Sequence, residues 1–253
     1  VILYDGSPFY PDETTLLKMA DKSEITVFGT SAKYIASLES TGIKPETIST
    51  FPKLRTILST GSPLVEENYD FVYNHWKEDV QLSSISGGTD LISCFALGNP
   101  TLPVKRGEIQ CRGLGMKVES FDEKGESVYD CKGELVCTQA FPSMPIYFWD
   151  DKKNEKYKAA YFETFPGVWH HGDYININSQ GGVQIFGRSD TTLNPGGVRI
   201  GTAEIYQTVD QFSEVEDSLA IGQPWRNDER IILFIKLKMG AHLTKALIDE
   251  IKQ

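Results

Sequence analysis

The stretch that decides the fold is Trp169–Arg199, WHHGDYININSQGGVQIFGRSDTTLNPGGVR. Apolar and polar residues alternate in two short runs within it, 174–178 and 183–186, and the turn-forming sequence SQGG separates these runs. This pattern predicts a β-hairpin. Because the two ends of an antiparallel hairpin lie together, we expect Asp173 at the entry and Arg188 at the exit to face one site.

A carboxylate and a guanidinium at one place suit different parts of a nucleotide. The Asp173 carboxylate can accept hydrogen bonds from a pair of sugar hydroxyls, and the Arg188 guanidinium can hold a phosphate in a fork. The plainer alternative is a surface hairpin whose ends carry an ordinary salt bridge. The pair therefore predicts a nucleotide site, with the salt bridge as the alternative.

The overall composition argues against several classes of function. The 253 residues carry a formal net charge of −10 and contain no tract of Lys or Arg, which argues against nucleic acid or a membrane surface as a partner. The longest apolar runs, such as 231–235, are far too short to span a bilayer. The four cysteines lack C-x-x-C spacing, so we expect reduced thiols and a cytoplasmic (cytosolic) protein.

Residues 1–98 alternate between short apolar runs and helical stretches. Strands are expected at 1–4, 26–28, 54–59 and 80–85, and helices at 13–22, 32–39 and 66–77. This βαβ order predicts a mostly parallel sheet with helices on its faces, and hence an α/β fold. Ligands of such sheets bind beyond the carboxyl ends of the strands, so the loops at those ends are candidate sites.

Two polar, glycine-bearing loops follow strands of this predicted sheet. The first is Ser59–Pro63, which by itself is most often only a turn. The second is Ser83–Asp90, where glycines let backbone amides approach an anion and Thr89 adds a hydroxyl. The Asp90 carboxylate is a hard oxygen ligand of the kind that Mg²⁺ prefers. A tight Ser/Gly turn without a ligand is the alternative for the second loop.

From Thr101 onward the pattern changes to short alternating strands separated by glycines. The strands are expected at 108–112, 116–121 and 133–138, as antiparallel β structure that forms a small barrel. A charged, helical segment at 150–157 precedes the key hairpin. His170 and His171 are neighbours in a strand and should point to opposite faces, which argues against a metal shared between them.

After Arg188 the composition changes again. The polar, glycine-rich run DTTLNPGGV at 190–198 is a candidate linker and hinge. Beyond it we expect a helix, two strands and a second helix, at 202–212, 215–221, 229–238 and 243–252. This region predicts a small α+β segment.

The key stretch resembles the adenylate-forming enzymes, the family that includes acyl-CoA synthetases and peptide-synthetase adenylation domains. The positions that match the family pattern are Trp169, Gly172, Asp173, Gly187, Arg188, Asp190, Asn194, Gly197, Arg199, Ile200, Glu204 and Ile205. The resemblance implies that residues 1–188 are the distal part of a large adenylation domain, with an α/β part at 1–98 and a β-rich part at 99–188. Residues 189–253 would then be the hinge and an incomplete, small C-terminal domain.

The resemblance also implies a reaction in two steps. A carboxylic acid attacks the α-phosphorus of ATP, giving an acyl-adenylate and pyrophosphate, and CoA then displaces AMP to give a thioester. Mg²⁺ serves the first step, and Asp90, which stands where the family has Glu, would help to hold it. Thr89 and Arg188 would stabilise the phosphates, and Asp173 would hold the ribose.

The resemblance gives the full set of expected binding residues. The nucleotide- and CoA-binding positions that it implies are Gly61, Ser62, Pro63, Ser86, Gly87, Gly88, Thr89, Asp173, Arg188, Gly196, Gly197 and Arg199. The loop at 61–63 would pack against the adenine. The glycines and the arginine at 196–199 would approach CoA or the phosphate when the small domain swings about Asp190. His171 is expected to form a wall of the nucleotide site.

The expected acid follows from short matching segments and from Gly87. The segments VILYDGSPFYPD, GSP and WHHGDY look most like the acetyl- and acetoacetyl-CoA synthetase branch of the family. Members that take only acetate place Trp at the position of Gly87, which closes the acyl pocket. A glycine there leaves room for a longer or more polar acid, and the resemblance implies acetoacetate. A related ligase for propionate or butyrate, and a truncated, non-catalytic nucleotide-binding module, are the alternatives.

The chain is also expected to be a fragment of a longer enzyme. It opens on what reads as a strand, without Met, and stops in what reads as a helix. By the resemblance, the family's phosphate loop would lie before Val1 and its adenylation lysine beyond Gln253. This segment by itself would then catalyse little.

Overall fold

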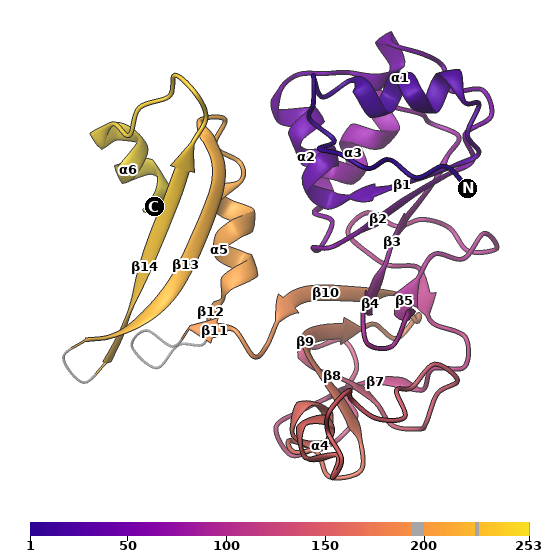
Figure 1. The fold of residues 1–253 in the computed structure, drawn as a ribbon, viewed down its shortest axis with the longest axis vertical. Coiled ribbons are helices and arrows are strands. Elements are labelled where there is room, and N and C mark those ends of the chain that lie inside the picture. The colour runs from indigo at the N-terminus through magenta and orange to yellow at the C-terminus, as the bar shows by residue number, and fades with distance from the viewer. Residues whose placement is uncertain (194–199, 226–227, 253) are drawn as a thin grey trace. The chain divides into compact units, whose positions relative to one another are not determined.

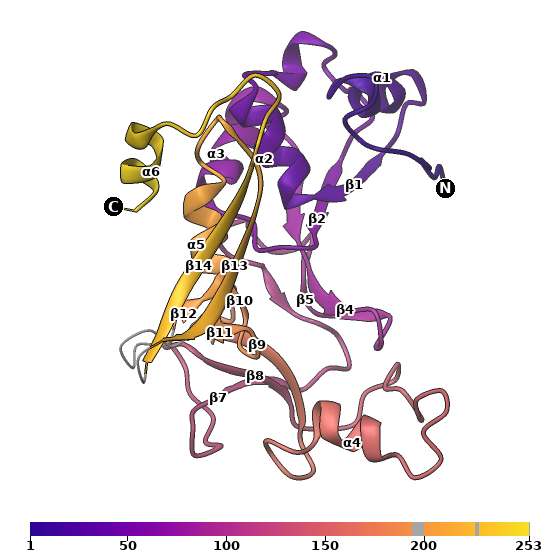
Figure 2. The ribbon, with the colours of Figure 1, turned by 60° about the vertical axis from the view of Figure 1, so that its left-hand side comes forward.

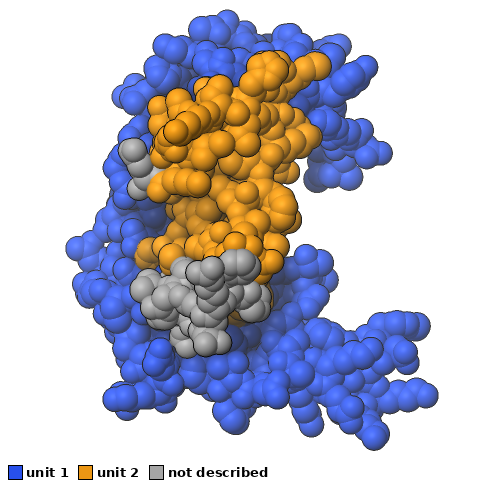
Figure 3. Space-filling view, turned by 90° about the vertical axis from the view of Figure 1, so that its left-hand side faces the viewer, with its two compact units in different colours: residues 1–171, 176–185 blue, residues 172–175, 186–253 orange. Residues whose placement is uncertain are grey.

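The computed structural model describes residues 1–193, 200–225 and 228–252, and the chain divides into two compact units. Unit 1 contains residues 1–171 and 176–185, and unit 2 contains residues 172–175 and 186–253 (Figure 3). The domain boundary expected at residue 188 stays a prediction about the parent protein.

The N-terminal part of unit 1 is a three-stranded parallel sheet with helices packed on it. The strands β1 (Val27–Ser31), β2 (Thr56–Thr60) and β3 (Gln81–Ser84) follow one another in this order across the sheet. Helices α1 (Thr15–Lys22), α2 (Ala32–Ser40) and α3 (Glu66–His75) gather beside the sheet, and a short 3₁₀ helix, η1 (Pro45–Thr47), follows α2 (Figure 1). The predicted βαβ order and parallel sheet are confirmed.

The core of this part lies where the helix faces meet the sheet. Side chains from all three helices and from β2 and β3 are almost completely buried there: Leu17, Ile35, Leu38, Ile57, Val72 and Leu82. The ring of Trp76 meets Phe28 of β1 edge-on, with centroids 5.3 Å apart. Burial of such side chains contributes about 1.5–3 kcal/mol each, so this core fixes the strand ends that carry the two candidate loops.

Two predicted elements differ from the structure. Residues Val1–Tyr4 form no strand, because a strand needs a partner strand and these residues pair with none of the described ones. Helix α4 runs over Glu155–Tyr161, whereas the sequence predicted a helix at 150–157. The later start has a backbone cause, since Asp150 and Asn154 have φ of 54° and 55°, outside the right-handed helical region.

Antiparallel sheets follow the parallel one in the chain, and their strands β9 and β10 include residues of both units. Strands β4 (Ser86–Gly88), β5 (Ser93–Leu97) and β6 (Cys111–Arg112) form one sheet in that order. A four-stranded sheet has the order β10-β9-β8-β7, from β7 (Val118–Phe121), β8 (Gly133–Cys137), β9 (Trp169–Ile177) and β10 (Val183–Arg188). One isolated bridge, Ile109 to Val183, links the segment before β6 to β10. The expected small barrel thus takes the form of two sheets joined by this bridge.

The hairpin predicted from the key stretch is present as β9 and β10. Its turn is built by Asn178, whose side-chain oxygen accepts hydrogen bonds from the backbone N–H groups of Gln180 and Gly182, at 3.0 and 2.9 Å. The backbone N–H of Asn178 also donates to the carbonyl of Gly182, at 2.9 Å. This local network closes the hairpin, and the side-chain bonds of Asn are typical of such turns.

Unit 2 has the predicted α+β order. Short strands β11 (Thr192–Leu193) and β12 (Ile200–Gly201) pair, α5 (Thr202–Val209) follows, and β13 (Val215–Trp225) pairs with β14 (Asp228–Leu237) before α6 (Lys245–Ile251) (Figure 2). Helix α5 lies against β13, where the Tyr206 hydroxyl accepts a hydrogen bond from the backbone N–H of Ala220 at 3.2 Å. Most of the predicted hinge, residues 194–199, lies outside the described residues.

Within the described ranges, no helix combines the length and the apolar character needed to cross a membrane.

Candidate functional site

The two ends of the hairpin bring Asp173 and Arg188 together, as the sequence predicted. Arg188 Nη1 donates to Asp173 Oδ1 at 3.3 Å, and the backbone N–H of Ser189 donates to the carbonyl of Gly172 at 2.8 Å. The Asp173 carboxylate is mostly buried, whereas the Arg188 side chain is 46% exposed. The pair thus has a fixed carboxylate and a cation that solvent can reach.

Asp190 completes this cluster from the other side of the guanidinium. Arg188 Nε donates to Asp190 Oδ1 at 2.9 Å, and Arg188 Nη2 bonds the second oxygen of the same carboxylate. Gly172 lies underneath with φ of 78°, and a Cβ there would be 3.0 Å from Arg188 Nη2. Glycine is therefore required at position 172 by its backbone conformation and by the approach of the arginine. A phosphate bound at Arg188 would compete with the Asp190 carboxylate for the guanidinium N–H groups.

The two glycine-bearing loops lie side by side at the carboxyl ends of β2 and β3. Because these strands are parallel neighbours, the backbone N–H of Ile85 donates to the carbonyl of Ser59 at 2.8 Å. The Thr60 hydroxyl donates to the carbonyl of Ile85 at 3.2 Å. The structure therefore brings Gly61–Pro63 next to Ser86–Asp90, at the edge of the sheet where ligands of α/β proteins bind.

Gly87 and Gly88 are enclosed by neighbouring groups. A Cβ at Gly87 would lie 2.2 Å from the carbonyl oxygen of Ser93, and a Cβ at Gly88 would lie 2.9 Å from Cε1 of His171. The approach of β4 to β5 therefore requires glycine at position 87. This backbone contact accounts for the missing side chain without reference to the size of an acyl substrate.

Thr89 and Asp90 follow β4 in an exposed turn, and a tyrosine from α4 bonds the acid. The Tyr161 hydroxyl donates to Asp90 Oδ2. The sequence analysis did not single out Tyr161. Its spacing of four from Tyr157 indicates an aromatic face of a helix, and nothing in that spacing points to Asp90.

Trp169 and His171 pack behind this turn. The Tyr161 ring stacks on Trp169 with centroids 3.6 Å apart, and Trp169 Nε1 donates to His171 Nδ1 at 3.5 Å. In a neutral imidazole this bond leaves the proton on Nε2. His170 instead bonds Glu134, with 2.9 Å between Nε2 and Oε2, so the two histidines have different partners, as expected for opposite faces of β9. The role of His171 as a wall of a nucleotide site stays a prediction.

The start of α4 is fixed by a buried acid. Asp151 Oδ2 accepts a hydrogen bond from the backbone N–H of Tyr157 at 2.9 Å. Burial by itself raises the pKa of Asp151, but the backbone hydrogen bonds from Tyr157, Lys156 and Glu155 and the charge of Lys156 outweigh it, so the pKa lies below its ordinary value. The carboxylate therefore anchors the helix that carries Tyr161.

The chemistry of Thr89 and Asp90 fits a magnesium ion that arrives with a nucleotide. Mg²⁺ is usually held by one or two carboxylates together with substrate phosphates, and both residues offer hard oxygen atoms in an exposed turn. In the part of the chain that the structure describes, no three His, Cys, Asp or Glu side chains cluster as a metal site. Asp90 can thus contribute one ligand, with phosphate oxygens as further ligands.

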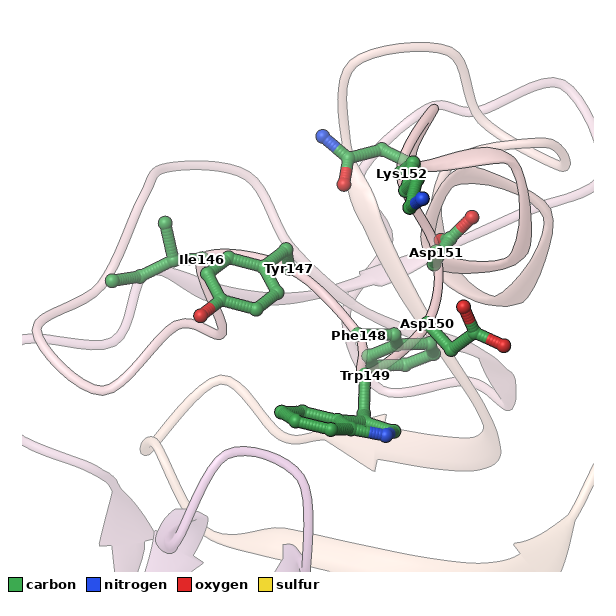
Figure 4. Close-up of a pocket in the computed structure, with 8 residues that line it drawn as sticks. Ile146, Tyr147, Phe148, Trp149, Asp150, Asp151 and Lys152 are labelled. Carbon is green, nitrogen blue, oxygen red and sulfur yellow. The ribbon is translucent and has the colours of Figure 1, made fainter.

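A surface hollow of about 610 Å³ lies elsewhere, in the loop before α4 (Figure 4). Its lining comes from one continuous segment: Ile146, Tyr147, Phe148, Trp149, Asp150, Asp151, Lys152 and Asn154. The side chain of Trp149 is 91% exposed. None of the predicted site residues lines this hollow, and the predicted residues Gly196, Gly197 and Arg199 lie outside the described residues.

Comparisons with known proteins identify the family. No family model matches the chain. Acetoacetyl-coenzyme A synthetase of Rhizobium meliloti (strain 1021) is 55% identical over 250 residues, and acetoacetyl-CoA synthetase of Xenopus tropicalis is 50% identical over 254 residues. These alignments cover 99% and 100% of this chain, and the chain spans 38% of the length of each relative.

Solved structures agree with the sequence relatives. Acetoacetyl-CoA synthetase from Streptomyces lividans superposes with a TM-score of 0.86 at 42% identity, over 99% of this chain and 38% of that one. The anthranilate CoA ligase AuaEII, solved with anthranoyl-AMP, has a TM-score of 0.75 at 20% identity over 98% of this chain and 46% of that one, and it supports the fold alone. By sequence and fold together, the chain belongs to the adenylate-forming acyl-CoA synthetase family and matches a segment of the acetoacetyl-CoA synthetases.

Proposed function

We propose that the protein containing this chain activates acetoacetate with ATP and transfers the acyl group to CoA, giving acetoacetyl-CoA, AMP and pyrophosphate. The observation that carries this proposal is the 55% identity to an acetoacetyl-CoA synthetase over 99% of the chain. The meeting of Asp173 and Arg188 at 3.3 Å supports it, because the family pattern requires both groups at one place.

The residues contribute to the first step by binding and by charge. Attack of the carboxylate on the α-phosphorus places negative charge on the phosphoryl oxygens and on the leaving pyrophosphate. Arg188 and the Thr89 hydroxyl stabilise that charge, and the mostly buried Asp173 accepts hydrogen bonds from the ribose. The loop Gly61–Pro63 packs against the adenine, and Ser86–Gly88 lets backbone amides approach the phosphates.

Magnesium and CoA complete the set of small molecules. Asp90 holds the Mg²⁺, which supplies positive charge to the phosphates of ATP when it is bound. Gly196, Gly197 and Arg199 approach CoA or phosphate in the second step. The pattern Gly-Gly-x-Arg at 196–199 supports this role because it matches the family pattern in sequence.

The choice of acid has a second candidate. The close approach of the Ser93 carbonyl explains the glycine at position 87 without reference to the size of the acyl group. Gly87 therefore does not distinguish between acids, and a ligase for propionate or butyrate is the competing proposal. Acetoacetate is favoured because the relatives at 50% and 55% identity are acetoacetyl-CoA synthetases.

A cytosolic setting is part of the same proposal. Cys94, Cys111, Cys131 and Cys137 are all free thiols. Burial raises the pKa of the Cys94 and Cys137 thiols, so both stay protonated near neutral pH and behave as packing residues. The net charge of −10 supports small-molecule substrates rather than nucleic acid as partners.

The test is acid-dependent ATP–pyrophosphate exchange by the full-length protein. Acetate, propionate, butyrate and acetoacetate are compared at saturating ATP and Mg²⁺, and formation of each acyl-CoA is followed with CoA added. We expect acetoacetate to give the highest kcat/KM. Faster exchange with propionate or butyrate would replace acetoacetate as the substrate, and no exchange with any acid would remove the ligase proposal.

A further inference from the structure

The contact between Tyr161 and Asp90 joins two distant parts of unit 1 and has no role in the proposed function. Tyr161 is the last residue of α4 and lies 71 positions after Asp90 in the chain. Its hydroxyl donates to Asp90 Oδ2. A phenol bonded to a carboxylate fixes the rotation of that carboxylate, which an exposed aspartate would otherwise sample freely.

The phenol is itself held in place by packing. The Tyr161 ring stacks on Trp169 with an interplanar angle of 14°, and Trp169 is 2% exposed. Phe148 meets the Tyr161 ring edge-on, with centroids 6.0 Å apart and planes at 80°. Aromatic contacts of this kind favour fixed ring orientations, so the Tyr161 hydroxyl has a fixed position before any ligand binds.

The same indole supports the other end of the loop. Trp169 Nε1 bonds His171, and the His171 ring lies against Gly88, where a Cβ would be 2.9 Å from Cε1. Phe95 of β5 holds the imidazole from another side, with ring centroids 4.8 Å apart. Trp169 therefore supports both flanks of residues 88–90, through His171 at the glycine and through Tyr161 at the acid.

We propose that Tyr161 is a positioning residue that holds the Asp90 carboxylate in the orientation needed to bind Mg²⁺ together with ATP. This proposal rests on the proposed function, because the role of Asp90 toward Mg²⁺ belongs to it. A carboxylate has about four lone-pair sites, so a phenol on one leaves capacity for a cation. Hydrogen-bond partners of a metal ligand typically change metal affinity or activity by about 10–100-fold when they are removed.

The test is Tyr161→Phe in the full-length protein, which removes the hydroxyl and keeps the stacked ring. Tyr157→Phe is the matched control, because Tyr157 lies one turn earlier on α4 and its hydroxyl donates to the Pro145 carbonyl at 2.8 Å. Mn²⁺ serves as the probe and is titrated by electron paramagnetic resonance into protein with ATP and no acid, so that no turnover occurs. The Mg²⁺ dependence of ATP–pyrophosphate exchange with acetoacetate is measured in parallel.

We expect Tyr161→Phe to weaken ATP-dependent Mn²⁺ binding about 10–100-fold and to raise the half-saturating Mg²⁺ similarly, with the KM for acetoacetate unchanged. Tyr157→Phe should match the wild type in both measurements. If Tyr161→Phe binds Mn²⁺ as tightly as the unmodified protein does, the positioning role is overturned. The proposed function still stands in that case, provided that the unmodified protein catalyses ATP–pyrophosphate exchange. If the unmodified protein catalyses no ATP–pyrophosphate exchange, the proposed function is overturned instead.

A double variant checks that Tyr161 acts through Asp90. If it does, Tyr161→Phe adds no further loss of Mn²⁺ affinity to Asp90→Asn, because the hydroxyl has lost the group that it orients. Additive losses overturn the proposal. Circular dichroism of each variant confirms that the fold is retained.

Discussion

Two regions of the molecule present charged side chains in opposite ways. In unit 1, the Asp90 carboxylate is held by an uncharged hydroxyl that rests on stacked aromatic rings. In unit 2, the Arg188 guanidinium is held by the two carboxylates of Asp173 and Asp190, and its side chain is 46% exposed. One charge is positioned by packing, and the other is positioned by other charges.

This difference sets how easily each group can exchange partners. Exposed ion pairs contribute about 0–1 kcal/mol and weaken as salt rises, so Arg188 can give up Asp190 for a phosphate at little cost. A buried aromatic cluster loses several kcal/mol when it is disrupted, so the turn at Asp90 keeps its shape. The Asp90 carboxylate is therefore fixed in place, whereas the Arg188 guanidinium can exchange its partners.

The largest expected effect is the loss of the aromatic support. Trp169→Ala should lower the free energy of unfolding by about 3–5 kcal/mol, since Trp169 is 2% exposed and contacts several rings. Urea unfolding of the full-length protein measures this change. Trp149→Ala is the control, because its indole is 91% exposed and should change stability by less than about 0.5 kcal/mol. Equal stability of the two variants would contradict the support assigned to Trp169.

The next effect concerns the charge cluster. Arg188→Ala should lower the rate of ATP–pyrophosphate exchange by about 10²–10³-fold, because a donor to the developing phosphoryl charge is lost. Stability should change little, because the side chain is half exposed. Arg106→Ala is the matched control, since Arg106 also bonds two carboxylates, those of Asp70 and Glu66, on the surface of unit 1. Equal exchange rates in both variants would remove Arg188 from the site.

A smaller effect is expected from closing the space at Gly87. Gly87→Ala should cost about 1–3 kcal/mol, because its Cβ would lie 2.2 Å from the Ser93 carbonyl and β4 would have to move away from β5. Gly29→Ala in β1 is the control, since a Cβ there meets nothing within 4 Å. Thermal unfolding compares the two. A fully stable Gly87→Ala variant that prefers shorter acids would instead favour the acyl-pocket interpretation.

The smallest effect is a pH dependence of the helix that carries Tyr161. The pKa of Asp151 in the folded protein lies below its ordinary value of about 3.9. The ionised carboxylate therefore stabilises the folded protein fully above that ordinary pKa. This stabilisation is lost as the pH falls through the lowered pKa of the folded state. Asp151→Asn should therefore be less stable than the wild type at pH 7, and the difference should shrink below about pH 4. A difference independent of pH would contradict the assignment.

Local patterns in the sequence predicted most of the elements. The alternating runs on either side of SQGG gave the hairpin, and the meeting of Asp173 with Arg188 followed from its antiparallel geometry. The prediction of a strand at 1–4 was wrong because a strand depends on a partner strand, which a short apolar run does not reveal. The start of α4 was misplaced because the left-handed backbone at Asp150 and Asn154 leaves no clear signal in composition.

The sequence by itself determined the hairpin, the βαβ order and the family, because turn residues, hydrophobic periodicity and motif spacing act over short stretches of chain. Only the tertiary structure decided that Tyr161 bonds an acid 71 positions away, and that the carbonyl of Ser93 leaves no room for a side chain at Gly87. Both contacts depend on how separate elements pack. Packing is set by the shape of the whole core, which no local pattern specifies.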